Sequence, residues 1–223
     1  MDSAYKDAIA SLRVRADEGD SEKMLELGCL LQAGSGGVVK DERAAVRWFR
    51  RASDAGLPRA AWKLGEALMQ GAGVEKDTAQ AARWLEVAAR ANVQEAQRRL
   101  ADHLMVKKRT RSAALTLYGE AARGGCPHAM WQLARILIYN LDGAGQDFSS
   151  GAYWLKRAAE AGHGDAQWTL GHWHTTWCDG LVKRDRAQAR RWLTAAAVTA
   201  ARSGVRKPRH DASHSLFHSR QSS

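Results

Sequence analysis

Few residues in this chain have the types and spacing that catalysis requires. Ser3 and Lys6 match the Ser-x-x-Lys spacing in which a lysine can activate a serine nucleophile, but the Lys-Thr-Gly segment that accompanies this spacing in enzymes is absent. No nucleophile–base pair and no pair of carboxylates stands out elsewhere in the sequence. We therefore attribute the match to chance, assign no catalytic residue and predict a protein that is not an enzyme.

Histidine and cysteine occur at two spacings that could place metal ligands on one side of a helix. His174 and Cys178 are four residues apart, and His210, His214 and His218 repeat the same interval near the end of the chain. A structural zinc site needs four such donors, and neither set supplies them by itself. We predict no metal and no cofactor.

The composition favours acidic partners. Thirty-four Lys and Arg against 24 Asp and Glu give a formal net charge of +10, and the densest basic run lies at 107–111. Such a balance is typical of proteins that bind nucleic acid, an anionic surface or an acidic protein, and it does not choose among them.

The sequence carries no export or membrane signal. Asp2 stands where a signal peptide has basic charge, no apolar segment follows, and no run approaches the roughly 18 apolar residues of a membrane span. The three cysteines are far apart and indicate no disulfide framework, which favours a reducing compartment. We expect a cytoplasmic protein, or a periplasmic one if a leader has been removed.

A repeated pattern dominates the sequence. Four copies carry an Asp that is followed seven residues later by a Trp and four residues after that by an Ala. The pairs are Asp41 and Trp48, Asp77 and Trp84, Asp147 and Trp154, and Asp185 and Trp192, and a weaker fifth copy has Thr110 and Leu117. Successive Trp or Leu positions lie 36, 33, 37 and 38 residues apart, a period typical of stacked helical hairpins.

Each copy predicts two helices. Asp and Thr are good N-caps, and the sites four, seven and eleven residues later form one helical stripe, so a helix B begins there and ends at Gly56, Asn92, Gly125 or Gly162. Upstream of it, a helix A carries Leu-Gly or Leu-Ala at a fixed place, where the small residue lets a neighbouring helix approach closely. We expect the tryptophans of helix B to lie in the core.

These helices predict an all-α fold, a right-handed α/α superhelix (solenoid) of about five helical hairpins. The solenoid is expected to cover 1–204 and to be followed by a basic, flexible tail at 205–223. Its predicted parts are a capping helix at 3–19 and repeats at about 21–56, 57–92, 93–125, 126–162 and 163–203.

These columns resemble the Sel-one-like repeat (SLR) family of tetratricopeptide-like α-solenoids. Residues 61–89 fit the family pattern almost throughout, and the resemblance covers about 21–201, although the third copy has a short loop and Leu117-Tyr118 in place of Trp. It implies a bacterial interaction module: an adaptor or regulator of signalling, secretion or envelope processes, or an immunity protein against a toxin. The β-lactam chemistry of cysteine-rich relatives is not implied, because this chain lacks their paired cysteines.

A second stripe of helix A is the candidate binding surface. Relative to the small residue, the sites at −3, +1 and +4 lie opposite the core stripe, and in tetratricopeptide-like stacks such a stripe lines the concave groove. The predicted groove residues are Trp62, Glu66, Met69, Arg98, Asp102, Met105, Trp131, Arg135, Ile138, Trp168 and His172. Trp, Met and Arg are enriched at protein interfaces, so we predict an adaptor that binds a protein segment there, with an acidic segment among the candidates.

Two alternatives stay open. The ring at the −3 site could pack against the next helix A instead of contacting a partner. The basic residues of helix B could form a solvated convex face, or an electrostatic footprint that makes the chain a nucleic-acid-associated or acidic-protein-binding solenoid. No RNA-reading motif is visible in the sequence.

We expect removal of residues 205–223 to leave the thermal stability unchanged, because their basic residues belong to no apolar pattern that could pack on the solenoid. Circular dichroism melts of the full and truncated chains would measure this. Phe217 is the residue that could contradict it, and a lower midpoint after truncation would mean that the tail is a structural cap.

Overall fold

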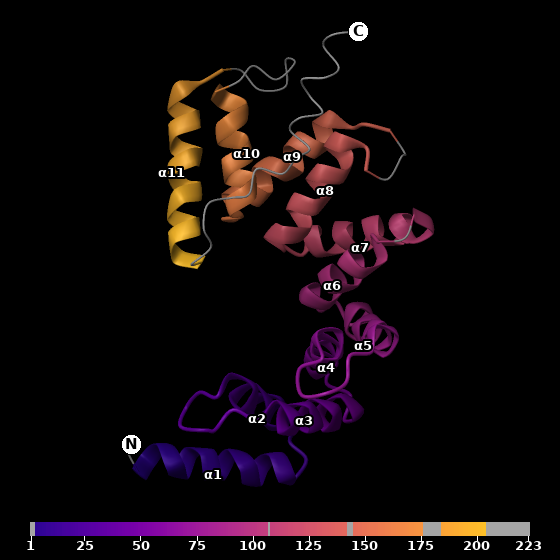
Figure 1. Cartoon of the computed structure of the whole chain (residues 1–223), viewed down its shortest axis with the longest axis vertical. Coiled ribbons are helices and arrows are strands. Elements are labelled where there is room, and N and C mark those ends of the chain that lie inside the picture. Colours follow the sequence, from indigo (N-terminus) through magenta and orange to yellow (C-terminus); the bar gives the residue numbers. More distant parts are fainter. Residues whose placement is uncertain (1–2, 107, 142–144, 176–183, 204–223) are drawn as a thin grey trace. The chain divides into compact units, whose positions relative to one another are not determined.

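The computed structural model describes residues 3–106, 108–141, 145–175 and 184–203. Within these ranges it consists of eleven α-helices and one short 3-10 helix, without a β-strand (Figure 1). In chain order they are α1 (Ser3–Asp17), α2 (Ser21–Ala33), α3 (Glu42–Asp54), α4 (Pro58–Gln70), α5 (Thr78–Arg90), α6 (Gln94–Leu104), η1 (Lys108–Thr110), α7 (Arg111–Arg123), α8 (Pro127–Tyr139), α9 (Phe148–Glu160), α10 (Gly164–Thr175) and α11 (Arg186–Ser203). The predicted all-α fold is confirmed, and the predicted tail lies outside the described residues.

Even-numbered helices from α2 to α10 are the predicted A helices, and odd-numbered helices are the B helices. The chain divides into two compact units, Met1–Ala121 and Ala122–Ser223. In the first unit α2 packs on α3 and α4 on α5, while α3 and α5 also pack on the A helix that follows. In the second unit α8 packs on α9, α9 on α10, and α10 on α11. Each unit is therefore a stack in which neighbouring hairpins bury each other's apolar stripes.

The predicted capping aspartates begin four of the B helices. Asp41 accepts a hydrogen bond from the amide of Ala44 at 2.9 Å, and Asp77 accepts one from Gln80 at 2.9 Å. Bonds from the side chain and the amide of Ser150 hold the pKa of Asp147 below its ordinary value. Each bond satisfies an amide of the first turn that has no partner inside the helix.

The last capping aspartate, Asp185, accepts bonds from the amides of Ala187 and Gln188 at 2.8 and 3.0 Å. The contracted third loop is built differently. There the 3-10 turn η1 runs directly into α7, and the hydroxyl of Thr110 donates to the carbonyl of Leu104 at 2.5 Å. The short loop thus closes back on the end of α6.

The two helices of a hairpin cross where one of them carries a glycine. A Cβ added at Gly28 would lie 2.5 Å from Cε1 of Phe49, and one added at Gly65 would lie 2.9 Å from Cγ of Leu85. In the α8–α9 hairpin the roles are exchanged, since Gly151 on the B helix faces Ile138 on the A helix at 2.5 Å. The predicted close approach is confirmed, and it joins the two helices of one hairpin.

This crossing explains why the tryptophans are less buried than the sequence suggests. In the first two hairpins the residue after the Trp, eight positions beyond the cap, faces the glycine: Phe49 and Leu85 are 0% exposed, whereas Trp48 and Trp84 are half-buried at the edge of the core. At 100° per residue, the sites at seven and eight positions cannot both point at the crossing. Trp192 is the exception, at 8% exposure.

We expect Gly28→Ala to destabilise the first unit, although alanine is the better helix former. Overpacking costs about 1–3 kcal/mol, which exceeds the ~1 kcal/mol that alanine gains over glycine in a helix. The crowding comes from Phe49, which would have to move away from the new methyl group. A lower midpoint in a circular dichroism melt would be the sign of this loss.

Gly164→Ala is the matched control for this variant. A Cβ at Gly164 would lie 3.4 Å from Cγ2 of Thr199, which is ordinary contact, so we expect an unchanged or higher midpoint. Equal losses in the two variants would mean that Gly28 does not mark a point of close approach.

Candidate protein-binding site

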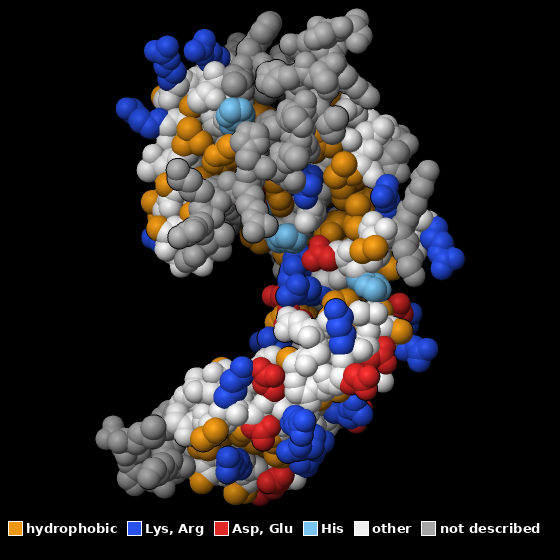
Figure 2. Space-filling model, in the orientation of Figure 1, with side chains coloured by type: hydrophobic (Ala, Val, Ile, Leu, Met, Phe, Trp, Pro, Cys, Tyr) orange, Lys and Arg blue, Asp and Glu red, His pale blue; other side chains and the backbone are white. Residues whose placement is uncertain are grey.

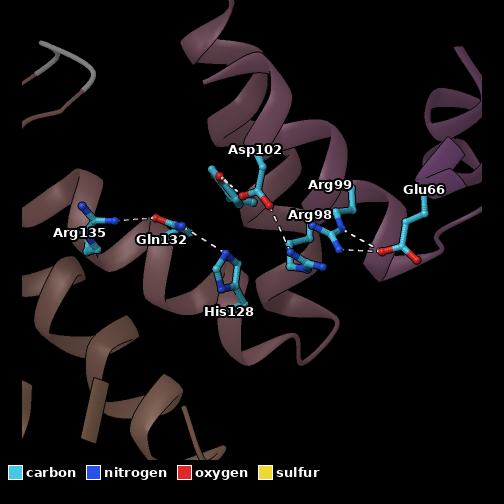
Figure 3. Close-up of polar contacts among 8 residues, drawn as sticks. Glu66, Arg98, Arg99, Asp102, His128, Gln132 and Arg135 are labelled. Carbon is cyan, nitrogen blue, oxygen red and sulfur yellow. Dashed lines mark hydrogen bonds and ion pairs between the residues drawn. The ribbon is translucent and has the colours of Figure 1, made fainter. Parts of the chain in front are cut away.

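In the first unit, the polar groove residues bind one another. Glu66 on α4 is 15% exposed in its side chain, and its Oε1 accepts hydrogen bonds from Nη2 and Nε of Arg99 at 2.7 and 3.0 Å (Figure 3). Nζ of Lys63 lies 3.5 Å from the other carboxylate oxygen. A two-pronged, charge-assisted contact of this kind fixes geometry, so Glu66 joins α4 to α6.

The second carboxylate of this surface is also occupied. Nη1 of Arg98 lies 3.1 Å from Oδ2 of Asp102, and the hydroxyl of Tyr118 donates to Oδ1 of Asp102 at 2.6 Å (Figure 3). Tyr118 lies on α7 and is 2% exposed. Asp102 therefore holds α7 against α6, since removal of the carboxylate would leave a buried hydroxyl without this acceptor.

The apolar groove residues of the first unit pack between repeats. Trp62 contacts the apolar cluster that contains Leu85 and Leu100, and Met69 contacts that cluster and the one before it. Nζ of Lys63 lies 4.2 Å above the Trp62 ring. For Trp62 the structure thus agrees with the alternative of inter-repeat packing. Met105, half-buried, caps the C-terminus of α6.

In the second unit, α8 presents a row of three polar residues on one face. Nε2 of Gln132 lies 3.2 Å from Nε2 of His128, and Nη1 of Arg135 donates to Oε1 of Gln132 at 3.2 Å (Figure 3). The Arg135 guanidinium also lies 5.8 Å from the centre of the Trp131 ring, within cation–π range. This row holds the arginine beside a half-buried indole.

Aromatic rings stack along the same unit. The ring of His163, just before α10, lies 5.6 Å from the Trp131 ring and 5.6 Å from the His128 ring. On α10, Trp168 and His172 stack in parallel at 5.3 Å and 2°. Trp131, Trp168 and His172 are half-buried, so part of each ring is covered and part meets solvent.

One predicted groove residue was assigned to the wrong face. Ile138 is 2% exposed, and its Cγ1 fills the space above Gly151 at the α8–α9 crossing. The sequence reasoning placed the small residue on helix A in every copy. In this copy the glycine lies on helix B, so the large residue comes from helix A.

His163 is a residue of this site that the sequence reasoning missed. Its Nδ1 accepts a hydrogen bond from the amide of Ala166 at 3.4 Å, so the ring caps α10. Burial, and then the neighbouring His128, lower its pKa from 6.5 to about 4. The signal was available in the sequence, because the corresponding position before other A helices holds Leu57 or Val93.

Most basic side chains of the B helices are exposed, and two of them lie beside acidic side chains. Nη1 of Arg51 lies 3.3 Å from Oδ1 of Asp17, and Nζ of Lys156 lies 3.9 Å from Oε1 of Glu160. Figure 2 shows Lys and Arg interspersed with Asp and Glu over the first unit. Such a surface is typical of a solvated face, where exposed pairs contribute little energy.

A separate groove of about 1150 Å³ lies at the loop edge of the first unit. The A–B loops of the first two hairpins form it together with α1, and its lining includes Arg13, Val38, Lys40, Glu42 and Val74. Its walls are polar and apolar in similar measure, and none of the predicted groove residues lines it. The described residues contain no cluster of three or more metal-ligating side chains.

A family model for the Sel1 repeat matches residues 24–57, 58–93, 127–163 and 164–197, which is more than half of the chain. The chain belongs to the Sel1 repeat family. The predicted family and solenoid class are therefore confirmed. The third predicted copy, at 93–125, lies outside the four matches, so the division into five repeats stays a prediction.

Solved Sel1 repeat structures share the fold. A Sel1 repeat protein from Oxalobacter formigenes has a TM-score of 0.70 at 23% identity, over 81% of this chain and 72% of that chain. Two immunity proteins from Pseudomonas aeruginosa have TM-scores of 0.60 and 0.58 at 18% and 17% identity, each over 92% of this chain and over 74% and 75% of their own. No curated protein sequence matches the chain.

Sel1 repeats are protein-interaction modules, and the fold is a scaffold that is typically non-enzymatic. Across the described residues, no helix is long and apolar enough to cross a membrane. The family membership agrees with the coarse expectation of an interaction module and suggests a protein partner. The particular groove residues remain predictions.

We expect acid to weaken the second unit through His163. The folded ring binds a proton less readily than the unfolded one, so its stabilisation is complete above pH 6.5 and is lost as the pH falls towards 4. The whole shift corresponds to at most about 3 kcal/mol. Urea unfolding at pH 7 and pH 4.5, followed by circular dichroism, measures the difference.

His163→Val isolates this contribution, because it installs the kind of residue found before other A helices. The variant should lose less unfolding free energy than the wild type between pH 7 and pH 4.5. The same loss in both proteins would mean that His163 is not the group responsible.

Proposed function

We propose that this chain is a non-enzymatic bacterial adaptor that binds a segment of a partner protein across the A-helix face of α8 and α10. Trp131, Arg135, Trp168 and His172 are the contact residues of this face. The role is regulatory, secretion-related or toxin-neutralising, and the immunity proteins among the structures that share the fold support the last of these.

The observation that carries the proposal is the half-buried state of these aromatic rings. A ring that is partly packed is already held in one orientation. It therefore loses little conformational freedom when a partner covers the rest of it. Arg135 is oriented in the same way by Gln132 and by the Trp131 ring. Trp and Arg in such settings are the residues most enriched among binding hot spots.

We assign the corresponding face of the first unit to holding its own helices together rather than to anchoring the partner. Glu66 and Asp102 accept ion pairs and hydrogen bonds from their own chain. Trp62 is half-buried like Trp131, but it packs against the apolar cluster between repeats and is covered by Lys63. A partner that engaged these groups would have to break contacts that hold α4, α6 and α7 together. We therefore assign Glu66, Met69, Arg98, Asp102 and Met105 to supporting the surface rather than to anchoring the partner.

Combined replacement of Trp131→Ala and Arg135→Ala should weaken partner binding by roughly a thousandfold, because two hot-spot contacts are each worth about 2 kcal/mol. The partner is first captured from a lysate of the source bacterium on the immobilised wild-type chain, identified and purified. Its affinity for each variant is then measured by calorimetry.

The matched control is Tyr153→Ala with Arg157→Ala. These residues form an arginine–aromatic pair with the same four-residue spacing on a B helix, and the guanidinium again lies 5.8 Å from the ring. We expect this variant to bind normally. Equal losses from both variants would contradict the proposal, as would release of the captured material by nuclease, which would favour the nucleic-acid alternative.

A further inference from the structure

Helix α11 is the last described helix, and one of its faces lacks the cover that earlier B helices have. Twelve residues after the capping aspartate, Ala89 and Ala159 are 6% and 1% exposed. Ala89 belongs to the same apolar cluster as Ala96 and Leu100 of the following A helix, which covers it. The corresponding residue of α11, Ala197, is exposed. This face of α11 is therefore built like a surface on which another helix packs.

The face has an apolar floor and a basic rim, and we call it the end face. Ala189 is 3% exposed, and Leu193, whose other side packs on Gly171 of α10, is half-buried. They floor a shallow groove of about 540 Å³, which Thr175 at the end of α10 also lines. The α11 residues that line it are Arg186, Ala189, Arg190, Leu193, Thr194 and Ala197. They recur at three- and four-residue intervals, so they form one stripe that a second helix can follow.

Arg186 and Arg190 determine the charge that a helix packing on the end face must carry. Five residues after the cap, the earlier B helices carry Val46, Ala82, Leu115 and Ala152, whereas α11 carries the exposed Arg190. The segment Arg186–Ser203 contains no Asp or Glu. Figure 2 shows Lys and Arg grouped over α11 with no acidic side chain in view beside them. A helix that packs here must offer carboxylates to the rim, since a covered arginine without a partner is costly.

We propose that the end face of α11 docks an acidic amphipathic helix of a partner protein, with an apolar ridge on the floor and carboxylates against Arg186 and Arg190. Charge argues against residues 204–223 of the chain itself, because they carry Arg206, Lys207, Arg209 and Arg220 against Asp211. The end face is distinct from the α8–α10 site, so the two can bind different parts of one partner or two partners. This second surface does not depend on the proposed function of the first.

Three synthetic helical peptides of 18 residues probe the end face on the full chain. The first has a Leu and Ala ridge flanked by Glu, the second has the same composition with the ridge scrambled, and the third has Lys in place of Glu. Fluorescence anisotropy should show saturable binding of the first peptide only. Binding should weaken as sodium chloride rises, because the rim contacts are ionic.

Arg190→Glu should weaken binding of the acidic peptide at least about tenfold and should allow the Lys peptide to bind. Arg191→Glu is the matched control: it changes the same charge on the next residue, whose guanidinium lies 5.2 Å from the Trp192 ring, and it should alter affinity little. Ala197→Glu, at an exposed site on the floor, should abolish binding without lowering the melting midpoint.

Other occupants predict different results. If residues 204–223 cover the face, a chain truncated after Ser203 will bind the acidic peptide while the full chain does not. If a second copy covers it, the chain will self-associate with rising concentration and Arg190→Glu will reverse this. Either result overturns the proposal, as does equal binding by the Arg190→Glu and Arg191→Glu variants.

Discussion

The close crossing of two helices within a hairpin is the constraint on which the rest of the structure depends. Helix backbones approach to this degree only where one side chain is missing, as at Gly28, Gly65 and Gly151. The space is filled by one large residue of the other helix: Phe49, Leu85 and Ile138 are each at most 2% exposed. The crossing fixes how the paired helices are rotated about their own axes. It thereby decides which side chains face the solvent, where a partner can reach them.

The sequence predicts the helices and their caps well, because these depend on local rules. Asp41 and Asp77 cap their helices as N-cap chemistry requires, and Gly56 and Asn92, both at positive φ, follow the ends of these helices. Burial is predicted less well, since the rotation of a helix about its axis depends on its neighbour. A shift of one residue moves the buried site from Trp48 to Phe49, and exchange of the small residue between helices moves Ile138 from groove to core.

The two units use the same helix face in different ways. On α4 and α6 the face is occupied by internal contacts, among them the pairing of Glu66 with Arg99 and the hydrogen bond from Tyr118 to Asp102. On α8 and α10 it carries rings that are held in place but not fully covered. Repetition of one hairpin thus lets some copies use this face for contacts within the stack while others leave part of their rings open to solvent.

Hydroxyl-radical footprinting of the chain with and without its captured partner tests the central claim most directly, because it reports the solvent access of individual aromatic side chains. The account predicts slower oxidation of Trp131, Trp168 and His172 in the complex, and unchanged oxidation of Tyr153 and Trp154 on the B-helix face. Protection of Tyr153 and Trp154 with no change at Trp131 and Trp168 would contradict it.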